Sequence, residues 1–106
     1  MELETILNRI YLLPPEAIQA TMRCVSVVEH PKGYTLLKEN KIENNIFLIK
    51  KGIVRAYSVF DGTEVTFWFG KEGDPVISMK SYVEGKKGYE SIELLEDSTF
   101  YKIRSE

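Results

Sequence analysis

The sequence predicts a single, mainly-β domain with helices at its N-terminus, built as an antiparallel roll or barrel. The chain has 106 residues, which is the length of one domain. Hydrophobic residues recur at helical spacing only near the start of the chain. From residue 25 onward, short β-branched and aromatic runs alternate with turn sequences. Many short strands separated by turns are typical of antiparallel rolls and barrels.

Two helices are expected in the N-terminal segment 1–24. The range 2–13 carries apolar residues at helical spacing, and Pro14-Pro15 ends it because the residue before a proline avoids the α conformation. Pro15 and Glu16 suit the start of a second helix over 15–24. We expect the first helix to pack on the roll formed by 25–106 through one apolar face: Leu3, Ile6, Leu7 and Ile10.

The remainder of the chain predicts short strands. Asp61-Gly62 is a hairpin signal between two of them. Strict alternation in the strand that follows would place Phe67 and Phe69 on one face and Trp68 on the other. Residues 39–45, 70–75 and 84–88 read as loops, and 76–83 as one or two helical turns. The expected strands are 25–29, 35–38, 46–49, 53–60, 63–69, 89–95 and 99–103.

Composition excludes several function classes. The net charge of -2 argues against a nucleic-acid clamp, and the acidic start lacks the form of a signal peptide. One cysteine and one histidine exclude an internal disulfide, a multi-cysteine zinc site and His-rich metal chemistry. We expect Cys24 to be a small buried hydrophobe and His30 to be a turn residue. The expectation is a cytoplasmic, non-enzymatic protein that contacts no membrane and has no metal or other cofactor.

The central part of the chain resembles the cyclic-nucleotide-binding domain of the Crp/Fnr regulator superfamily. The resemblance begins near Val25 and rests on the order and spacing of several segments. The tail 90–98 is similar to the Bacteroidetes-type branch. The matching runs are Pro31-Lys32-Gly33 with Leu36, then 51–57, 61–66, Phe69 and Glu72-Gly73-Asp74.

The resemblance implies a β-roll (double-stranded β-helix or jelly roll) of about eight short strands, with a short helix in the phosphate-cassette position. It implies the sensor domain of a transcriptional regulator, which in full length would be a homodimer and would bind DNA through a C-terminal helix-turn-helix. This chain ends at Glu106, where the dimer helix of the family would begin. We therefore expect DNA binding to belong to residues outside this sequence.

The phosphate cassette departs from the family pattern. In members that bind cyclic nucleotides, a Gly-Glu pair opens a short helix and an arginine follows about ten residues later. Backbone N–H groups at the helix start hold the phosphate, and the arginine adds charge-assisted bonds. Aligned on Gly73-Asp74, these three positions hold Ile77, Ser78 and Gly88. We expect neither cAMP nor cGMP to bind.

Candidate ligand-binding residues lie in and around this cassette. Ser78, Lys80 and Ser81 either form a remodelled anion site or belong to a surface turn. Tyr89 either fills the pocket or accompanies a changed ligand. Lys86 and Lys87 are able to bind phosphate, although a glycine-flanked charged loop is usually solvated. An inner cavity is expected with the border Trp68, Ile77, Ser78, Met79 and Tyr89.

Arg55 and Trp68 have competing interpretations. Arg55 either serves an anionic ligand or, as we prefer, forms a surface ion pair with Glu64 across the hairpin. Trp68 either caps a pocket or, more commonly for such a residue, covers one face of a half-buried strand.

Three hypotheses follow. The first is a sensor domain for an unknown small molecule. The second is a ligand-free dimerisation and signalling scaffold on the same fold, with its pocket filled by the protein. The third, which we favour least, is a cupin-like protein; its metal site would need two or three histidines facing into the barrel.

Overall fold

The computed structural model describes residues 2–10, 16, 19, 23–43, 45–78 and 85–104. Among these residues, the helix α1 (Leu3–Ile10) precedes eight strands. Within the described residues, no helix is long and apolar enough to span a membrane. The strands are β1 (Val25–His30), β2 (Thr35–Leu37), β3 (Ile46–Lys51), β4 (Val54–Phe60), β5 (Thr63–Gly70), β6 (Pro75–Val76), β7 (Ser91–Leu94) and β8 (Ser98–Ile103).

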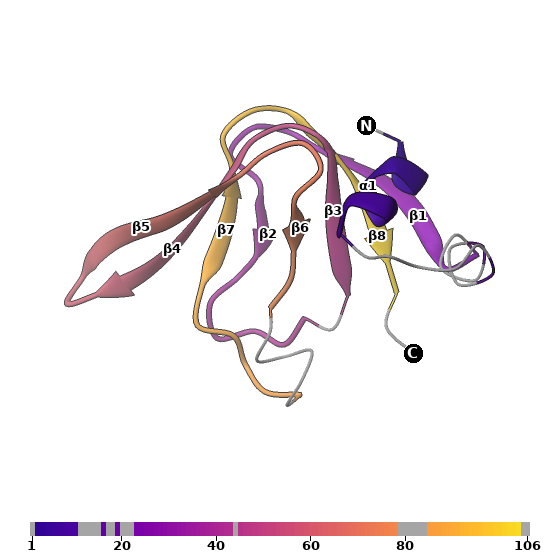
Figure 1. Cartoon of the computed structure of the whole chain (residues 1–106). Coiled ribbons are helices and arrows are strands. Elements are labelled where there is room, and N and C mark those ends of the chain that lie inside the picture. The colour runs from indigo at the N-terminus through magenta and orange to yellow at the C-terminus, as the bar shows by residue number, and fades with distance from the viewer. Residues whose placement is uncertain are drawn as a thin grey trace.

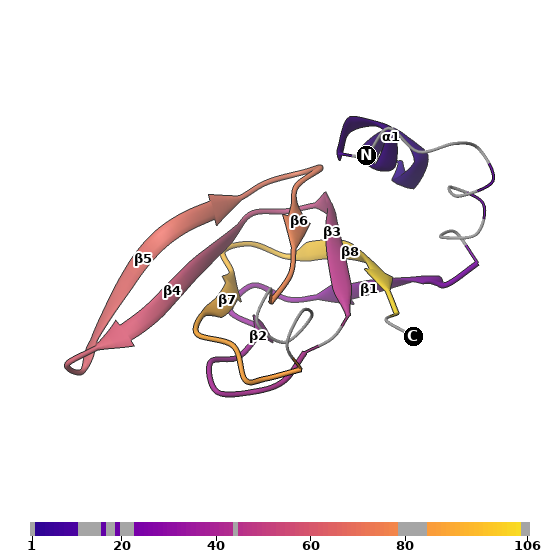
Figure 2. The same ribbon diagram turned by 60° about the horizontal axis from the view of Figure 1, so that its bottom comes forward.

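The strands form two four-stranded sheets, in the orders β1-β8-β3-β6 and β2-β7-β4-β5, and every pairing is antiparallel. Figures 1 and 2 show that the β4–β5 hairpin extends away from the other strands, while α1 lies at the opposite end. This confirms the predicted β-roll.

The main core lies between the two sheets. Alternation along β4 turns Val54 and Ala56 inward, and Phe47 and Ile49 do the same on β3. Phe47 and Phe100 meet edge to face, with ring centroids 6.2 Å apart. The buried members of this core are Leu37, Phe47, Ile49, Val54, Ala56, Val76, Ile92, Leu94 and Phe100.

A second core lies on the outer face of the β1-β8-β3-β6 sheet, under α1. Leu3, Ile6 and Leu7 of the helix are buried against Leu48 of β3 and Tyr101 of β8. The predicted packing of the helix on the roll is confirmed for these three residues, and the side chain of Ile10 lies outside the described part of the structure. This packing also explains why β3 begins with an unbroken apolar run, 46–49, because this part of the strand is buried on both faces.

The hairpin between β4 and β5 turns at Asp61-Gly62, as predicted. Both residues have positive φ, 50° and 77°. Positive φ at the two central residues is what a two-residue hairpin turn requires when its twist matches the strands. Glycine and aspartate tolerate this conformation, so the dipeptide sets where the chain reverses.

A β-bulge in β5 makes the face prediction for its aromatic residues wrong. Ala56 pairs with Trp68, whereas Tyr57 pairs with Thr66, so Phe67 is an extra residue on β5. A bulge interrupts strict alternation. Phe67 therefore lines the same hollow as Trp68.

Several predicted boundaries also need correction. The predicted loop 70–75 ends in β6 at Pro75, and Val76 is strand rather than helix. Ile77 and Ser78 are not helical, and the rest of the expected helical turn lies outside the described residues. Of the predicted second helix, Glu16 and Gln19 are helical and the Arg23 N–H donates to the Gln19 carbonyl at 3.3 Å, while Arg23 and Cys24 form the turn that follows. The remaining residues of that prediction lie outside the described ones, and Cys24 is half-buried rather than buried.

His30 is also not a turn residue. It is the last residue of β1, and its ring stacks on Tyr34 at 3.8 Å between centroids.

Candidate functional site

The inner hollow of the roll is small and apolar. It has a volume of about 210 Å³, below the roughly 300–1,000 Å³ of most ligand pockets. Its charged lining residue is Glu90, and no cation lines it among the described residues. A carboxylate without a neighbouring cation repels an anionic ligand. The lining consists of Ala56, Phe67, Trp68, Pro75, Val76, Ile77, Glu90 and Ile92.

Trp68 occupies part of the space inside the roll. A Cβ added to Gly70 would lie 2.5 Å from the Trp68 ring, so the indole lies directly against the backbone of Gly70. Glycine is needed at position 70 because the indole and Val54 leave no room for a side chain. The indole is 37% exposed, so it forms a wall of the hollow and is not fully part of the core.

The structure brings Ser78 and Gly88 into contact. A Cβ on Gly88 would lie 2.6 Å from Ser78 Oγ, closer than real Cβ atoms approach their neighbours. The Gly88 backbone is held in place, because its N–H donates to the Lys41 carbonyl at 3.0 Å and its carbonyl accepts from the Asn40 N–H at 3.1 Å. Ser78 Oγ is buried and has no hydrogen-bond partner in the described part of the chain. The two positions that carry glutamate and arginine in the resembled family are therefore adjacent, uncharged and closely packed.

Arg55 lies in an ion-pair cluster on the outer face of the β4 strand. Its Nε donates to Glu93 at 2.7 Å, and its two terminal nitrogens donate to Glu64 and Thr66, each at 2.8 Å. The guanidinium also lies 4.1 Å from the centroid of the Tyr57 ring. The hydrogen bonds that the guanidinium donates to Glu64, and next to Glu93, raise the pKa of Arg55. The predicted Arg55–Glu64 pair is confirmed, and the guanidinium is occupied by protein groups.

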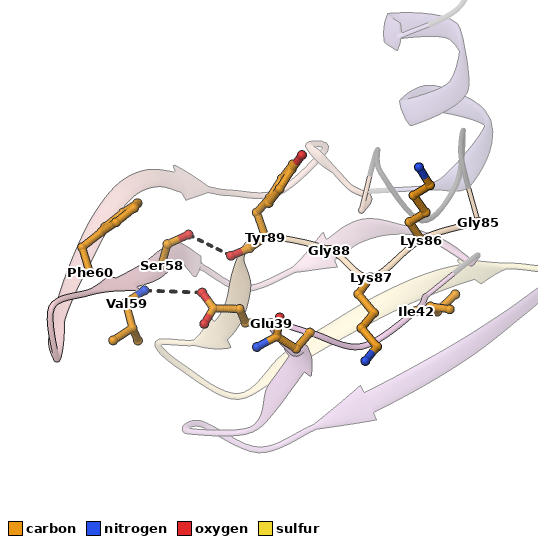
Figure 3. Close-up of a pocket in the computed structure, with 11 residues that line it drawn as sticks. Glu39, Ile42, Ser58, Val59, Phe60, Gly85, Lys86, Lys87, Gly88 and Tyr89 are labelled. Atoms are coloured by element: carbon orange, nitrogen blue, oxygen red, sulfur yellow. Dashed lines mark hydrogen bonds between the residues drawn. The ribbon is translucent and has the colours of Figure 1, made fainter.

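A larger cleft lies outside the roll, between the end of β4, the loop 39–42 and the segment 85–89. Figure 3 shows this cleft, whose volume is about 810 Å³. Ser58 Oγ donates to the Tyr89 carbonyl at 3.0 Å, and Glu39 accepts from the Val59 N–H at 3.4 Å. These two bonds connect the three segments that form the cleft.

The predicted cavity residues are divided between these places. Trp68 and Ile77 line the inner hollow, whereas Lys86, Lys87 and Tyr89 line the outer cleft. Tyr89 is 65% exposed, so of the two alternatives for this residue the one in which it fills the pocket does not hold.

Ser78 lines neither space, because it is buried beneath Gly88. Met79, Lys80 and Ser81 lie outside the described residues.

Sequence reasoning missed the opposite wall of the outer cleft. Glu39, Ile42 and Phe60 come from a polar loop and a hairpin end that carry no motif. The sequence did contain one signal for this cleft: a large aromatic residue stands next to a glycine-containing turn, Phe60 before Asp61-Gly62 and Tyr89 after Gly88. The structure shows that both aromatic side chains are exposed. Among the described residues, no three His, Cys, Asp or Glu side chains are placed to hold a metal ion.

Comparison with solved structures identifies the architecture. The regulatory domain of Toxoplasma gondii PKA with cAMP matches 95% of this chain at a TM-score of 0.87 and 12% identity. The fold is that of a cyclic-nucleotide-binding domain. The sensor domain of the transcriptional regulator DNR from Pseudomonas aeruginosa matches 92% of the chain at a TM-score of 0.78 and 13% identity.

A third structure with the same fold is the regulatory subunit of a cAMP-independent protein kinase A from Trypanosoma brucei. It was solved as a triple mutant bound to cAMP, with a TM-score of 0.83, 16% identity and 93% of this chain matched. The present cyclic-nucleotide-binding-like domain spans 40%, 36% and 64% of the Toxoplasma, Trypanosoma and Pseudomonas chains. No family model and no curated protein matches the sequence.

Proposed function

We propose that this chain is the sensor domain of a Crp/Fnr-type transcriptional regulator, and that its roll binds neither cAMP nor cGMP. The observation that carries the second part is the Ser78–Gly88 contact. The positions aligned with the glutamate and the arginine of the cassette are adjacent in space, as a shared phosphate site requires, but they offer no charge and no room.

The inner hollow supports the same proposal. Among the described residues that line the hollow, Glu90 is the charged one. The Trp68 indole lies against the Gly70 backbone and occupies part of the space inside the roll. No cation among the described residues would compensate the charge of a cyclic phosphate buried there, and an uncompensated buried charge costs several kcal/mol. The sensor proposal itself rests on the shared fold, because the DNR structure is described as the sensor domain of a transcriptional regulator. DNA binding and homodimerisation would belong to further parts of a regulator, and the domain itself would be non-enzymatic and cytoplasmic.

A thermal-shift titration with cAMP and cGMP tests this proposal. A ligand present at 100 times its Kd stabilises the folded state by about 2.7 kcal/mol, and each kcal/mol raises the Tm of a domain of this size by about 4–8 °C. We expect no shift at 1 mM of either nucleotide. A rise of 5 °C or more that saturates with concentration would contradict the proposal.

A ligand-free scaffold is the second candidate. It is favoured by the exposed aromatic side chains on the projecting hairpin, Phe60, Phe67 and Phe69, because exposed aromatic surface often marks an interface. It is not favoured by Tyr89, whose side chain lies in the open outer cleft. Sedimentation velocity at several protein concentrations distinguishes the two candidates, since the scaffold requires self-association of the ligand-free domain.

A further inference from the structure

The outer cleft has the size and lining of a small-molecule site. Its volume of about 810 Å³ falls within the range of ligand pockets, unlike that of the inner hollow. Large apolar side chains that elsewhere would be buried are exposed around it: Ile42 (54%), Val59 (46%), Phe60 (63%) and Tyr89 (65%). Covering this apolar surface with a ligand would be favourable, because it removes apolar area from water.

The polar groups at the base of the cleft are already bonded within the protein. Ser58 Oγ donates to the Tyr89 carbonyl, and Glu39 accepts from the Val59 N–H while its own N–H donates to Ser91 Oγ at 2.9 Å. These bonds build the cleft and use part of the hydrogen-bonding capacity of Ser58 and Glu39.

Lys87 is different from these groups. It is exposed, and it makes no hydrogen bond or ion pair with the part of the chain that the structure describes. Figure 3 shows Lys86 and Lys87 leaving the backbone in opposite directions, with Lys87 on the side where Ile42 lies. One available cation therefore lies next to apolar surface, and the Glu39 carboxylate adds a negative charge that disfavours a doubly charged ligand.

We propose that the outer cleft binds a small amphipathic monoanion. An aliphatic or aromatic body covers Ile42, Val59 and Phe60, and a single carboxylate pairs with Lys87. The inference extends the proposed sensor function by assigning the ligand class and a site outside the nucleotide pocket, and in that sense it rests on that function.

Titration of the 15N-labelled chain with octanoate, followed by NMR, tests the proposal. Octanoate carries both features, acetate lacks the apolar body, and octyltrimethylammonium carries the same body with the opposite charge. We expect saturable one-to-one binding of octanoate alone, with shifts concentrated at 39–42, 58–60 and 85–89. Acetate and the cation should bind at least tenfold more weakly, because each lacks one of the two features.

Matched variants separate specific from non-specific binding. Lys87→Gln should weaken octanoate binding about fivefold to tenfold, since it removes a charge-assisted bond, while the exposed Lys71→Gln control should leave it unchanged. Phe60→Ser should weaken binding, whereas Val27→Ser, equally exposed on β1, should not. Glu39→Gln should strengthen binding about twofold to fivefold, because it removes a like charge and keeps the acceptor for the Val59 N–H.

Two results would overturn the inference. One is the absence of octanoate binding at 10 mM, and the other is equal binding of octanoate and the cation with no effect of Lys87→Gln. Neither result touches the proposed function, whose claim that cAMP and cGMP do not bind fails separately if either nucleotide raises the Tm in the thermal-shift titration.

Discussion

The contact between Ser78 and Gly88 predicts that Gly88→Ala destabilises the native chain but stabilises a chain in which Ser78 is replaced by alanine. In the native chain, Gly88→Ala places a Cβ 2.6 Å from Ser78 Oγ, and we expect a loss of about 1–3 kcal/mol, as for other overpacked sites. In a Ser78→Ala background the nearest atom of residue 78 is its Cβ at 3.6 Å, an ordinary contact. Gly88→Ala should then stabilise by about 0.4–1 kcal/mol through the unfolded chain.

The two backgrounds form a double-mutant cycle with an expected coupling of about 1.4–4 kcal/mol, measured by urea unfolding. The slope of the unfolding transition should be the same in all four proteins, so that changes in midpoint report stability. Ser78→Ala alone should be neutral or stabilising, because it removes a buried hydroxyl without a partner. An equal cost of Gly88→Ala in both backgrounds would refute the reasoning, because the contact would then be absent in solution.

Three further substitutions test other parts of the structure. Arg55→Met should lower stability by about 1–2 kcal/mol, because it removes two ion pairs and the Tyr57 contact. In thermal unfolding, the difference in Tm between the variant and the native chain should be smaller in 1 M NaCl, which screens the ion pairs. If Arg55→Met left the Tm unchanged at low salt, the ion-pair cluster around Arg55 would contribute nothing to stability, against this prediction. Ile6→Ala should cost about 2–5 kcal/mol in urea unfolding if α1 packs on the roll, whereas the exposed Thr5→Ala should cost less than about 1 kcal/mol. An equal loss of stability for Ile6→Ala and Thr5→Ala would mean that α1 does not pack on the roll. Gly52→Ala should be more destabilising than Gly33→Ala in thermal unfolding, since both have positive φ but only the Cβ on Gly52 would overlap with Ser98. Equal losses would mean that the Ser98 contact contributes nothing.

Much of the fold could be predicted from the sequence because local signals agree with the tertiary structure. Asp61-Gly62 sets the hairpin, and the spacing of Leu3, Ile6 and Leu7 matches the helix face that is buried. The bulge at Phe67 could not be predicted, since three consecutive aromatic residues, Phe67 to Phe69, carry no mark of an extra residue and only the pairing with β4 shows it. The two-residue strand β6 was missed for a similar reason, because it exists only through its pairing with β3.

The candidate site was predicted less well than the fold. Alignment by spacing placed Ser78 and Gly88 at two cassette positions, and the structure does bring them together. The expected inner cavity was only partly right, because Tyr89 lies in a different cleft from Trp68. Which exposed side chains share a cleft depends on how the loops 39–42 and 85–89 approach the hairpin in space. These segments are far apart in the sequence, so no local sequence pattern predicts that they meet.

Equilibrium dialysis of the chain against radiolabelled cAMP tests the central claim most directly, since it measures occupancy without relying on a change in stability. The account predicts no bound nucleotide above background at 100 μM cAMP, because Ser78 and Gly88 provide neither charge nor space and Glu90 lines the hollow. One equivalent bound per chain with a Kd in the micromolar range, competed by unlabelled cAMP, would contradict it.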